Sequence, residues 1–567
     1  MIIFGLLWLG LFGAEAALSQ NSAASSSLSD ASPTVSIQKY GTIRGGRSEY
    51  IDTVYNFKNI PYAGAPTGAE RWKHPPHPTP WTGIRDATVF GPPCPQPGVS
   101  NYSEDCLGLN VWTPGNATFN DVTNSSTGQA GVVPSKTNSR YPVYVWIHGG
   151  RFTGGSSSDS LYDGSGLAKK GVIVVNMNYR LGALGFLAHP ELSANSTSGT
   201  SGNYGLVDQQ AALHWTYENI ASFGGDPSRI TIGGQSAGAA SVLDHLNSAL
   251  ATGLFNQVIA ESGATYPSNP LIGSLAQSYR HLREAEQEGA SFLKSLNISS
   301  IEEARAAPVE LLLAGSSLND NIYERTVFQN DSAYMEPPLF RPVLDGYVLP
   351  TTYEEMLRRG NHSIVPVLTG VNKDENGASP SPDFDVSNYT SLRNQEFGSV
   401  GLANEFFRLY PAGANSTTAG ESSNAFYRDQ SRVSTCLWAN EYLAGSFLNT
   451  SSNGTYSTYT YYWTHAPPGQ DQGAYHMSEI NYAFNNLYAT DRPWTQEDYK
   501  IASVMSDYWV NYIRTGSPNG KGLAYWPQNS INSSMIMELG DGWGIRPIAS
   551  KERISFIRHW FSEWPAY

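Results

Sequence analysis

One short stretch strongly constrains how this chain can fold. Between a predicted strand, Arg229 to Gly233, and a predicted helix, Ala237 to Ala249, lies the pentapeptide Gly234-Gln235-Ser236-Ala237-Gly238. A serine at such a strand-to-helix turn must take a strained backbone conformation, and glycines on both sides let strand and helix approach closely. The pattern is typical of a turn that exposes a nucleophilic hydroxyl group. For the pentapeptide alone, a glycine-rich turn with a capping serine is the alternative.

Apolar runs of strand length recur along the chain, with segments of helical character between them. One helical segment, Leu206 to Phe223, stops at Gly224-Gly225, as a helix closed by a glycine cap does. The predicted strands are Tyr141 to Ile147, Gly171 to Asn178, Arg229 to Ile232, Phe255 to Ala260, Ile364 to Thr369 and Thr458 to Trp463. This alternation predicts an α/β fold with a large, mostly parallel central sheet flanked by helices.

The N-terminus has the features of a secretion signal. Residues Ile2 to Leu11 are apolar and are followed by Ala14-Glu15-Ala16, which fits a small-residue cleavage site. An N-terminal membrane anchor is the alternative, but the run is too short to span a bilayer comfortably. We therefore expect a signal peptide (1–16), a flexible Ser/Ala-rich leader (17–34) and a single domain (35–567). The expected protein is secreted, extracellular and without a stable membrane anchor.

Within that domain, two segments are expected to lie outside the sheet. The polar residues 116–140 are predicted to form an exposed insertion. Residues 276–313 are rich in Glu, Ala and Leu and are predicted to form added helices of the kind that serve as a lid or pocket wall.

Sequons and charge bear on the partners of the chain. Its formal net charge of −14 argues against nucleic acid or an anionic membrane as a partner. The density of sequons in polar stretches favours N-linked glycans, which fits an extracellular route. The sequons begin at Asn101, Asn116, Asn124, Asn195, Asn297, Asn330, Asn361, Asn388, Asn415, Asn449, Asn453 and Asn532.

The chain has three cysteines. Cys94 and Cys106 are the expected disulfide pair, and closing their short loop would contribute about 3 kcal/mol in the chain-entropy model. Cys436 is expected to be a buried, inert thiol. No metal or other cofactor is expected, because the histidines lack a spacing such as His-Glu-X-X-His and no glycine-rich loop ends in Gly-Lys-Ser/Thr.

Acyl transfer by a serine needs a base, an acid that orients the base, and donors for the oxyanion. Ser236, Glu375 and His476 follow the chain order of nucleophile, acid and base found in α/β-hydrolases. Glu375 and His476 each lie in a loop after a predicted strand. From the residues alone, Asp374 competes with Glu375, and His465 competes with His476.

Further motifs resemble those of the type-B carboxylesterase/lipase family, which includes cholinesterases and fungal lipases. They are Gly41-Thr42-Ile43-Arg44-Gly45, Phe57-Lys58-Asn59-Ile60-Pro61-Tyr62-Ala63, the stretch Ser103 to Val111, and Phe223 to Gly238. The resemblance covers nearly the whole mature chain and is closest in character to secreted fungal members. It implies an α/β-hydrolase fold with inserted helices and loops over the active site. The family's acid and histidine motifs select Glu375 and His476 over their rivals.

The sequence departs from this family in the loop His148-Gly149-Gly150-Arg151-Phe152, where three glycines usually precede the aromatic residue. By resemblance, the oxyanion donors are the backbone N–H groups of Gly150, Arg151 and Ala237. If the loop requires a positive φ, arginine carries a conformational cost that glycine avoids. Either Arg151 projects toward the substrate or pairs with a carboxylate, or the hole is distorted and slow; we favour the first.

The residues around the predicted triad match the family in part. Gln235 stands where cholinesterase-like members carry glutamate, whereas Ser262 and Glu479 match the supporting network. The Cys94–Cys106 loop contains no tryptophan to bind a quaternary ammonium, so choline esters are not expected substrates.

The resemblance implies a secreted carboxylic ester hydrolase that uses a Ser-His-Glu triad and an acyl-enzyme intermediate, with a small-molecule or lipid ester as substrate. One alternative is a true lipase that acts on long-chain acylglycerols. The other is a non-catalytic, cholinesterase-like recognition domain that keeps the fold without the chemistry.

Overall fold

The computed structural model describes residues 32–117, 119, 140–448 and 457–567. The predicted signal peptide, nearly all of the predicted leader and most of the predicted insertion at 116–140 lie outside these residues. Residues from Pro33 onward form one unit. Its first strand begins at Thr34, one residue inside the predicted leader.

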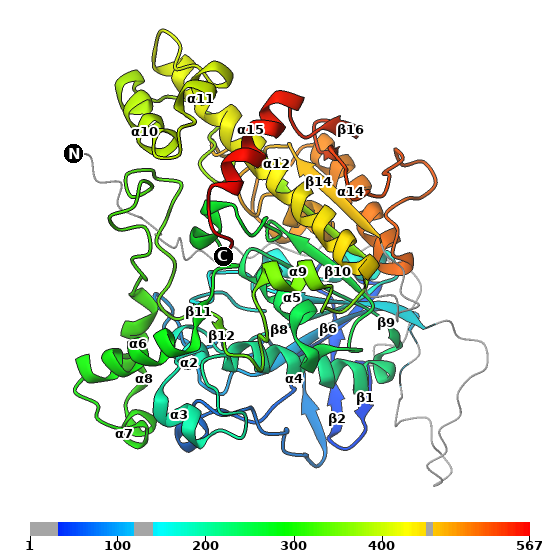
Figure 1. The fold of residues 1–567 in the computed structure, drawn as a ribbon. Helices are drawn as coiled ribbons and strands as arrows, with labels where there is room; N and C mark the ends of the chain where they lie inside the picture. Colours follow the sequence, from blue (N-terminus) through cyan, green and yellow to red (C-terminus); the bar gives the residue numbers. More distant parts are fainter. Residues whose placement is uncertain (1–31, 118, 120–139, 449–456) are drawn as a thin grey trace. The chain divides into compact units, whose positions relative to one another are not determined.

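An eleven-stranded sheet forms the centre of this unit, in the order β16-β15-β14-β13-β10-β9-β7-β8-β6-β4-β3 (Figure 1). From β8 to β15 every neighbouring pair is parallel, and the pairs at both ends are antiparallel. The predicted α/β class with a mostly parallel central sheet is confirmed. The strands are β3 (Gly46–Arg47), β4 (Val54–Pro61), β6 (Gly108–Pro114), β7 (Tyr141–Ile147), β8 (Ile173–Met177), β9 (Gly225–Gln235), β10 (Gln257–Glu261), β13 (Val367–Asn372), β14 (Thr458–Trp463), β15 (Met535–Leu539) and β16 (Gly544–Pro547).

The central strands β7, β8, β10, β13 and β14 are buried along nearly their whole length because helices cover both faces of the sheet. On β7, Val143 and Val145 belong to a core that also contains residues of α4 and α5. Tyr144 and Trp146, which point the other way, belong to a second core with residues of α13 and α14. Alternate side chains of one strand thus pack into two separate hydrophobic cores, one on each face of the sheet.

The helices are α1 (Ser165–Lys169), α2 (Gly182–Phe186), α3 (Pro190–Asn195), α4 (Tyr204–Asn219), α5 (Ala237–Asn247), α6 (Leu282–Ser295), α7 (Ile301–Ala306), α8 (Val309–Leu312), α9 (Tyr353–Arg359), α10 (Val386–Gly398), α11 (Ala403–Leu409), α12 (Ser416–Leu448), α13 (Ile480–Phe484), α14 (Gln496–Thr515) and α15 (Lys551–Ser562). Two smaller sheets join β1 (Thr34–Ile37), β2 (Gly41–Arg44) and β5 (Ile84–Asp86), and β11 (Arg280–His281) with β12 (Val343–Leu344).

Most predicted elements are found, with shifted ends. The strands predicted at 141–147 and 458–463 have the predicted bounds. The helix predicted from Leu206 to Phe223 is α4 followed by a 3₁₀ turn, and it ends at Gly224, whose φ of 87° suits glycine. The helices predicted within 276–313 are α6, α7 and α8, preceded by the short strand β11.

Candidate active site

Ser236 is the one residue between β9 and α5, and its backbone has a φ of 57° and a ψ of −120°. This conformation is strained for a residue with a side chain. The turn is tight: a Cβ added to Gly238 would lie 1.9 Å from the carbonyl oxygen of Ile147, and one added to Gly234 would lie 2.4 Å from the carbonyl carbon of Gly238. The two glycines are therefore needed where the sequence analysis expected them.

Glu375 and His476 meet at the carboxyl ends of two neighbouring parallel strands, β13 and β14. Nδ1 of His476 lies 2.5 Å from a carboxylate oxygen of Glu375, whose side chain is 2% exposed. A β-bridge between Asp374 and Tyr475 joins the two loops. This pairing leaves Nε2 of the imidazole as the nitrogen that can accept a proton.

The two competing residues have other partners. Asp374 pairs with Arg428 at 2.5 Å and accepts the N–H of Ala474 at 2.8 Å. His465 contacts Asp541 at 2.7 Å and Asp498 at 3.0 Å. The structure thus brings together Glu375 and His476 as the sequence analysis expected.

The side chain of Gln235 contacts the histidine. Its Nε2 is 3.0 Å from Nε2 of His476 and 3.3 Å from Nδ1. Because it is nearly equidistant from both ring nitrogens, the amide lies against the face of the imidazole, and the in-plane lone pair of Nε2 stays open. Among the hydrogen bonds of the described residues, none joins Ser236 to His476. The sequence analysis did not predict the contact of Gln235 with the imidazole.

Glu375 is held by groups from two strand ends. The hydroxyl of Ser262 donates to Oε1 of Glu375 at 3.1 Å, and the backbone N–H of Asn372 donates to the same oxygen at 2.6 Å. The Asn372 side chain donates to Glu479 at 2.5 Å and to the carbonyl of Tyr475 at 2.8 Å. Ser262 and Glu479 had been predicted as supporting residues, whereas Asn372 had not. Its signal in the sequence is a polar residue at the end of an apolar strand.

The loop Gly149 to Phe152 lies against the turn at Ser236. A Cβ added to Gly149 would lie 3.2 Å from Cβ of Ser236. Gly150, Arg151 and Phe152 have φ values of 111°, 56° and 61°, so the positive φ considered for Arg151 is found. Within the described part of the chain, the backbone N–H groups of Gly150, Arg151 and Ala237 donate no hydrogen bond. They are free to receive a negative oxygen.

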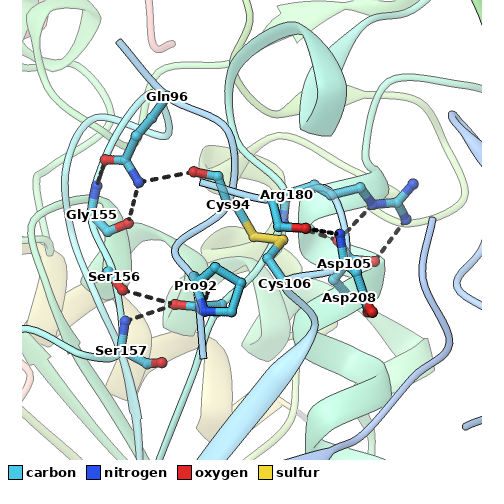
Figure 2. The surroundings of a disulfide bond; sticks show 12 residues. Pro92, Cys94, Gln96, Asp105, Cys106, Gly155, Ser156, Ser157, Arg180 and Asp208 are labelled. Atoms are coloured by element: carbon cyan, nitrogen blue, oxygen red, sulfur yellow. Dashed lines mark hydrogen bonds and ion pairs between the residues drawn. A yellow bond between two sulfur atoms is a disulfide. The ribbon is translucent and has the colours of Figure 1, made fainter. Parts of the chain in front are cut away.

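The predicted disulfide between Cys94 and Cys106 is present. It lies near Gly155, three residues after the loop Gly149 to Phe152 (Figure 2). The Gln96 side chain joins the two segments: it donates to the carbonyls of Cys94 at 3.1 Å and Gly155 at 2.9 Å, and accepts the N–H of Gly155 at 2.9 Å. Hydrogen bonds of Gln96 thus connect the loop closed by the disulfide to Gly155. Cys436 is a buried thiol, as expected.

Buried charges around His476 shift its titration. Burial lowers the pKa of His476, but the hydrogen bond and charge of Glu375, with the charge of Glu479, outweigh this and raise it. Burial also raises the pKa of Glu479 to about 7, against the hydrogen bond from Asn372. Burial and the charge of Glu479 raise the pKa of Glu261 well above its usual range. Burial therefore reduces the negative charge that Glu479 carries near neutral pH without removing it.

The described ranges contain no group of three or more His, Cys, Asp or Glu side chains arranged to hold a metal ion. Over the same residues, no helix has the length and apolar character needed to cross a bilayer.

Known proteins similar to this chain include esterases. A family profile described as "Carboxylesterase family" matches residues 31–557. The fumonisin B1 esterase of Sphingopyxis macrogoltabida is 32% identical over 516 residues, covering 87% of this chain and 86% of that protein. The para-nitrobenzyl esterase of Bacillus subtilis is 32% identical over 507 residues, covering 86% and 91%.

Two further comparisons bear on fold and function. A solved structure of a PNB esterase matches with a TM-score of 0.70 at 30% identity, covering 92% of this chain and 99% of that chain. Neuroligin-2 of Mus musculus is 32% identical over 537 residues, which cover 85% of this chain but 60% of that protein.

Proposed function

This chain belongs to the carboxylesterase family, and on that premise we propose that it hydrolyses carboxylic esters with Ser236 as nucleophile, His476 as general base and Glu375 as the acid that orients the base. Its sheet and helices form the α/β-hydrolase fold. The observation that carries the proposal is the 2.5 Å contact of Glu375 with His476, beside a serine held in a strained turn.

In the proposed first half-reaction, Nε2 of His476 takes the hydroxyl proton of Ser236 as the serine oxygen attacks the ester carbonyl carbon. Glu375 keeps the proton on Nδ1 and stabilises the imidazolium that forms. When the tetrahedral intermediate collapses, the alcohol leaves with the proton from His476, and an acyl-enzyme remains.

The free N–H groups of Gly150, Arg151 and Ala237 are proposed to hold the tetrahedral oxyanion. In the second half-reaction, His476 deprotonates a water molecule that attacks the acyl carbon. The proton then returns to the serine oxygen as the acid is released. Because the donors are backbone groups, an arginine in this loop is compatible with the chemistry.

The relatives are named as esterases, which favours carboxylic esters as substrates of this chain. The length of the acyl chain that is hydrolysed fastest distinguishes an esterase from a true lipase. The test is hydrolysis of p-nitrophenyl esters from acetate to palmitate by the wild type and by Ser236→Ala. We expect Ser236→Ala to lose at least about a thousandfold in kcat. An optimum at short chains would indicate an esterase, and one at long chains a lipase. If the folded wild type hydrolyses none of the series, the ester hydrolase proposal falls and a recognition domain, as the neuroligin similarity allows, becomes the better account.

We also propose that the protein is secreted with N-linked glycans, on the strength of the apolar N-terminal run and the sequons. Protein recovered from the culture medium should begin after residue 16 and lose mass on treatment with an N-glycosidase. Retention in the cells with an intact N-terminus would contradict secretion, and an unchanged mass would contradict glycosylation.

A further inference from the structure

The guanidinium of Arg151 has no acidic partner. It is half-buried, on a loop whose backbone lies against the Ser236 turn, and its Nη2 donates to the main-chain oxygen of Glu336 at 2.7 Å. No ion pair of the described residues includes Arg151, so the carboxylate partner that the sequence analysis considered is not found. Its Nε and Nη1 groups form no hydrogen bond within the same residues. The two donor edges of a guanidinium, Nε with Nη2 and Nη1 with Nη2, share Nη2, which uses one of its two hydrogens on Glu336. The other edge therefore keeps both of its donors.

The surroundings of Arg151 are more positive than the chain as a whole. Burial and the neighbouring charge of Arg341 both lower the pKa of Arg151. Asp320 is the acid of this region, and it already pairs with Arg280 at 3.0 Å and Arg341 at 2.9 Å. The Asp320 carboxylate thus pairs with two guanidinium groups and not with Arg151, in a chain whose net charge is −14.

The carboxylate of Glu336, whose main-chain oxygen accepts from Arg151, has another partner. The side chain of Glu336 accepts the N–H of Tyr323 at 3.1 and 3.2 Å through its two oxygens. Only its main-chain carbonyl contacts Arg151. Since a half-buried charge is costly unless it is paired, this arrangement points to a partner that arrives from outside the chain.

The backbone supports the same conclusion. Arg151 keeps a φ of 56°, which glycine would adopt without strain. The backbone N–H of Arg151 is free where the oxyanion would form. Its guanidinium lies at the end of the same residue's side chain, a few ångströms from that N–H. A ligand with both an ester carbonyl and an anionic group would use both features.

We propose that Arg151 binds a free carboxylate on the substrate, so that the preferred substrates are esters carrying a carboxylate a few bonds from the scissile carbonyl. This inference rests on the proposed ester hydrolase function and adds a substrate class to it. A guanidinium pairs with a carboxylate through two parallel hydrogen bonds, which gives both affinity and orientation. The bond to Glu336 fixes the guanidinium in place for that contact.

Two matched substrate pairs test the proposal and locate the carboxylate. Monoethyl glutarate and ethyl pentanoate differ by a carboxylate or a methyl group at the end of the acyl chain. 4-Acetoxybutanoate and butyl acetate differ in the same way at the end of the alcohol. The measured quantity is the ratio of kcat/KM for the anionic ester to that for the neutral ester, in which any change common to both substrates cancels.

Arg151→Gln keeps an N–H donor for the Glu336 carbonyl but removes the charge, whereas Arg151→Lys keeps the charge. For at least one pair, we expect the wild type to favour the anionic ester and Arg151→Gln to reduce the ratio by about tenfold or more. Arg151→Lys should retain part of the preference. Arg325→Gln is the control, because it removes the same charge from a side chain that is 90% exposed.

The outcomes separate the inference from the function on which it rests. Equal ratios in the wild type and Arg151→Gln for both pairs would overturn the inference and leave Arg151 as a tether to Glu336, while hydrolysis of the neutral esters would still support an esterase. The same loss in Arg151→Lys as in Arg151→Gln would also overturn it as a charge effect. No hydrolysis of any of the four esters by the folded wild type would overturn both proposals.

Discussion

Gln235 gives the resting site its most unexpected contact. A glutamate at this position, as in cholinesterase-like members, would add negative charge beside the imidazole, whereas the neutral amide adds a donor. That donor lies 3.0 Å from Nε2 and 3.3 Å from Nδ1 of His476, and so rests on the face of the imidazole. The contact leaves the lone pair of Nε2 open and limits how far the ring can tilt.

Replacing Gln235 by alanine should remove this support of the imidazole. We expect Gln235→Ala to lower kcat/KM for a small neutral ester by several-fold, because the ring is held less firmly in the orientation that the reaction needs. Steady-state kinetics at constant pH would measure the change. Gln472→Ala, which changes an exposed glutamine four positions before His476, should have no effect. An unchanged or higher kcat/KM in Gln235→Ala would contradict a positioning role for the amide.

The pH dependence of the reaction should report on Glu479. Because a general base must be unprotonated, kcat/KM falls as the pH drops through the pKa of His476, and the raised pKa puts this fall above the ordinary histidine range. Glu479→Gln removes one negative charge that raises this pKa, so the fall should move to lower pH. A pH profile of kcat/KM measures the shift, with the exposed Glu497→Gln as control. A shift to higher pH would contradict the assignment.

Among the helices and strands, those with a strong local pattern of apolar residues and glycines are the ones that the sequence predicts best. The strands β7 and β14 and the strand-turn-helix around Ser236 have strong apolar patterns and glycines at tight contacts. The 33-residue helix α12 was not predicted, since it mixes small, polar and aromatic residues and its burial is set by the elements packed around it. The contacts of Asn372 and Gln235 depend on the pairing of distant strands, which a single sequence does not contain.

The loop closed by the Cys94–Cys106 disulfide is joined through Gln96 to Gly155, close to the loop Gly149 to Phe152. Replacing both Cys94 and Cys106 by serine opens a loop with a sequence separation of 12 and should cost about 3 kcal/mol in the free energy of unfolding. Denaturant unfolding would measure the loss. A reductant should destabilise the wild type by a similar amount and leave the double variant unchanged. Equal stability of the two proteins would mean that Gln96 and its contacts hold the loop without the bond.

The whole molecule buries many charged and titratable groups. Arg393, which is 0% exposed in its side chain, pairs with Asp331 at 2.6 Å and with Glu396 at 2.5 Å, and so ties α10 to the segment before β12. Asp244 on α5 is also buried, and its Oδ1 accepts the hydroxyl of Tyr353 from α9. Such groups make the stability of the fold depend on pH.

Asp244 gives this dependence a definite sign. Burial raises its pKa to about 7, against the hydrogen bond from Tyr353. The folded state therefore binds the proton more tightly than the unfolded state, and stability falls as the pH rises from about 4 to 7. Asp244→Asn keeps the acceptor without the charge.

Between pH 5 and pH 8, the free energy of unfolding of Asp244→Asn relative to the wild type should increase by roughly 2 kcal/mol. Denaturant unfolding at the two pH values measures this difference. Asp491→Asn, at an exposed position, should show no such change. A relative stability that stays constant or decreases would contradict a protonated Asp244 in the fold.

The two ends of the central sheet differ from its interior in a way that bears on self-association. An open sheet leaves unpaired backbone groups on its outermost strands, where another chain can add a strand. Here one outermost strand is the two-residue β3, and the other is β16, which has four residues, carries Arg546 and finishes at Pro547. Neither offers a long, regular template, so a sheet this wide can be kept at high concentration without growing from molecule to molecule into fibrils.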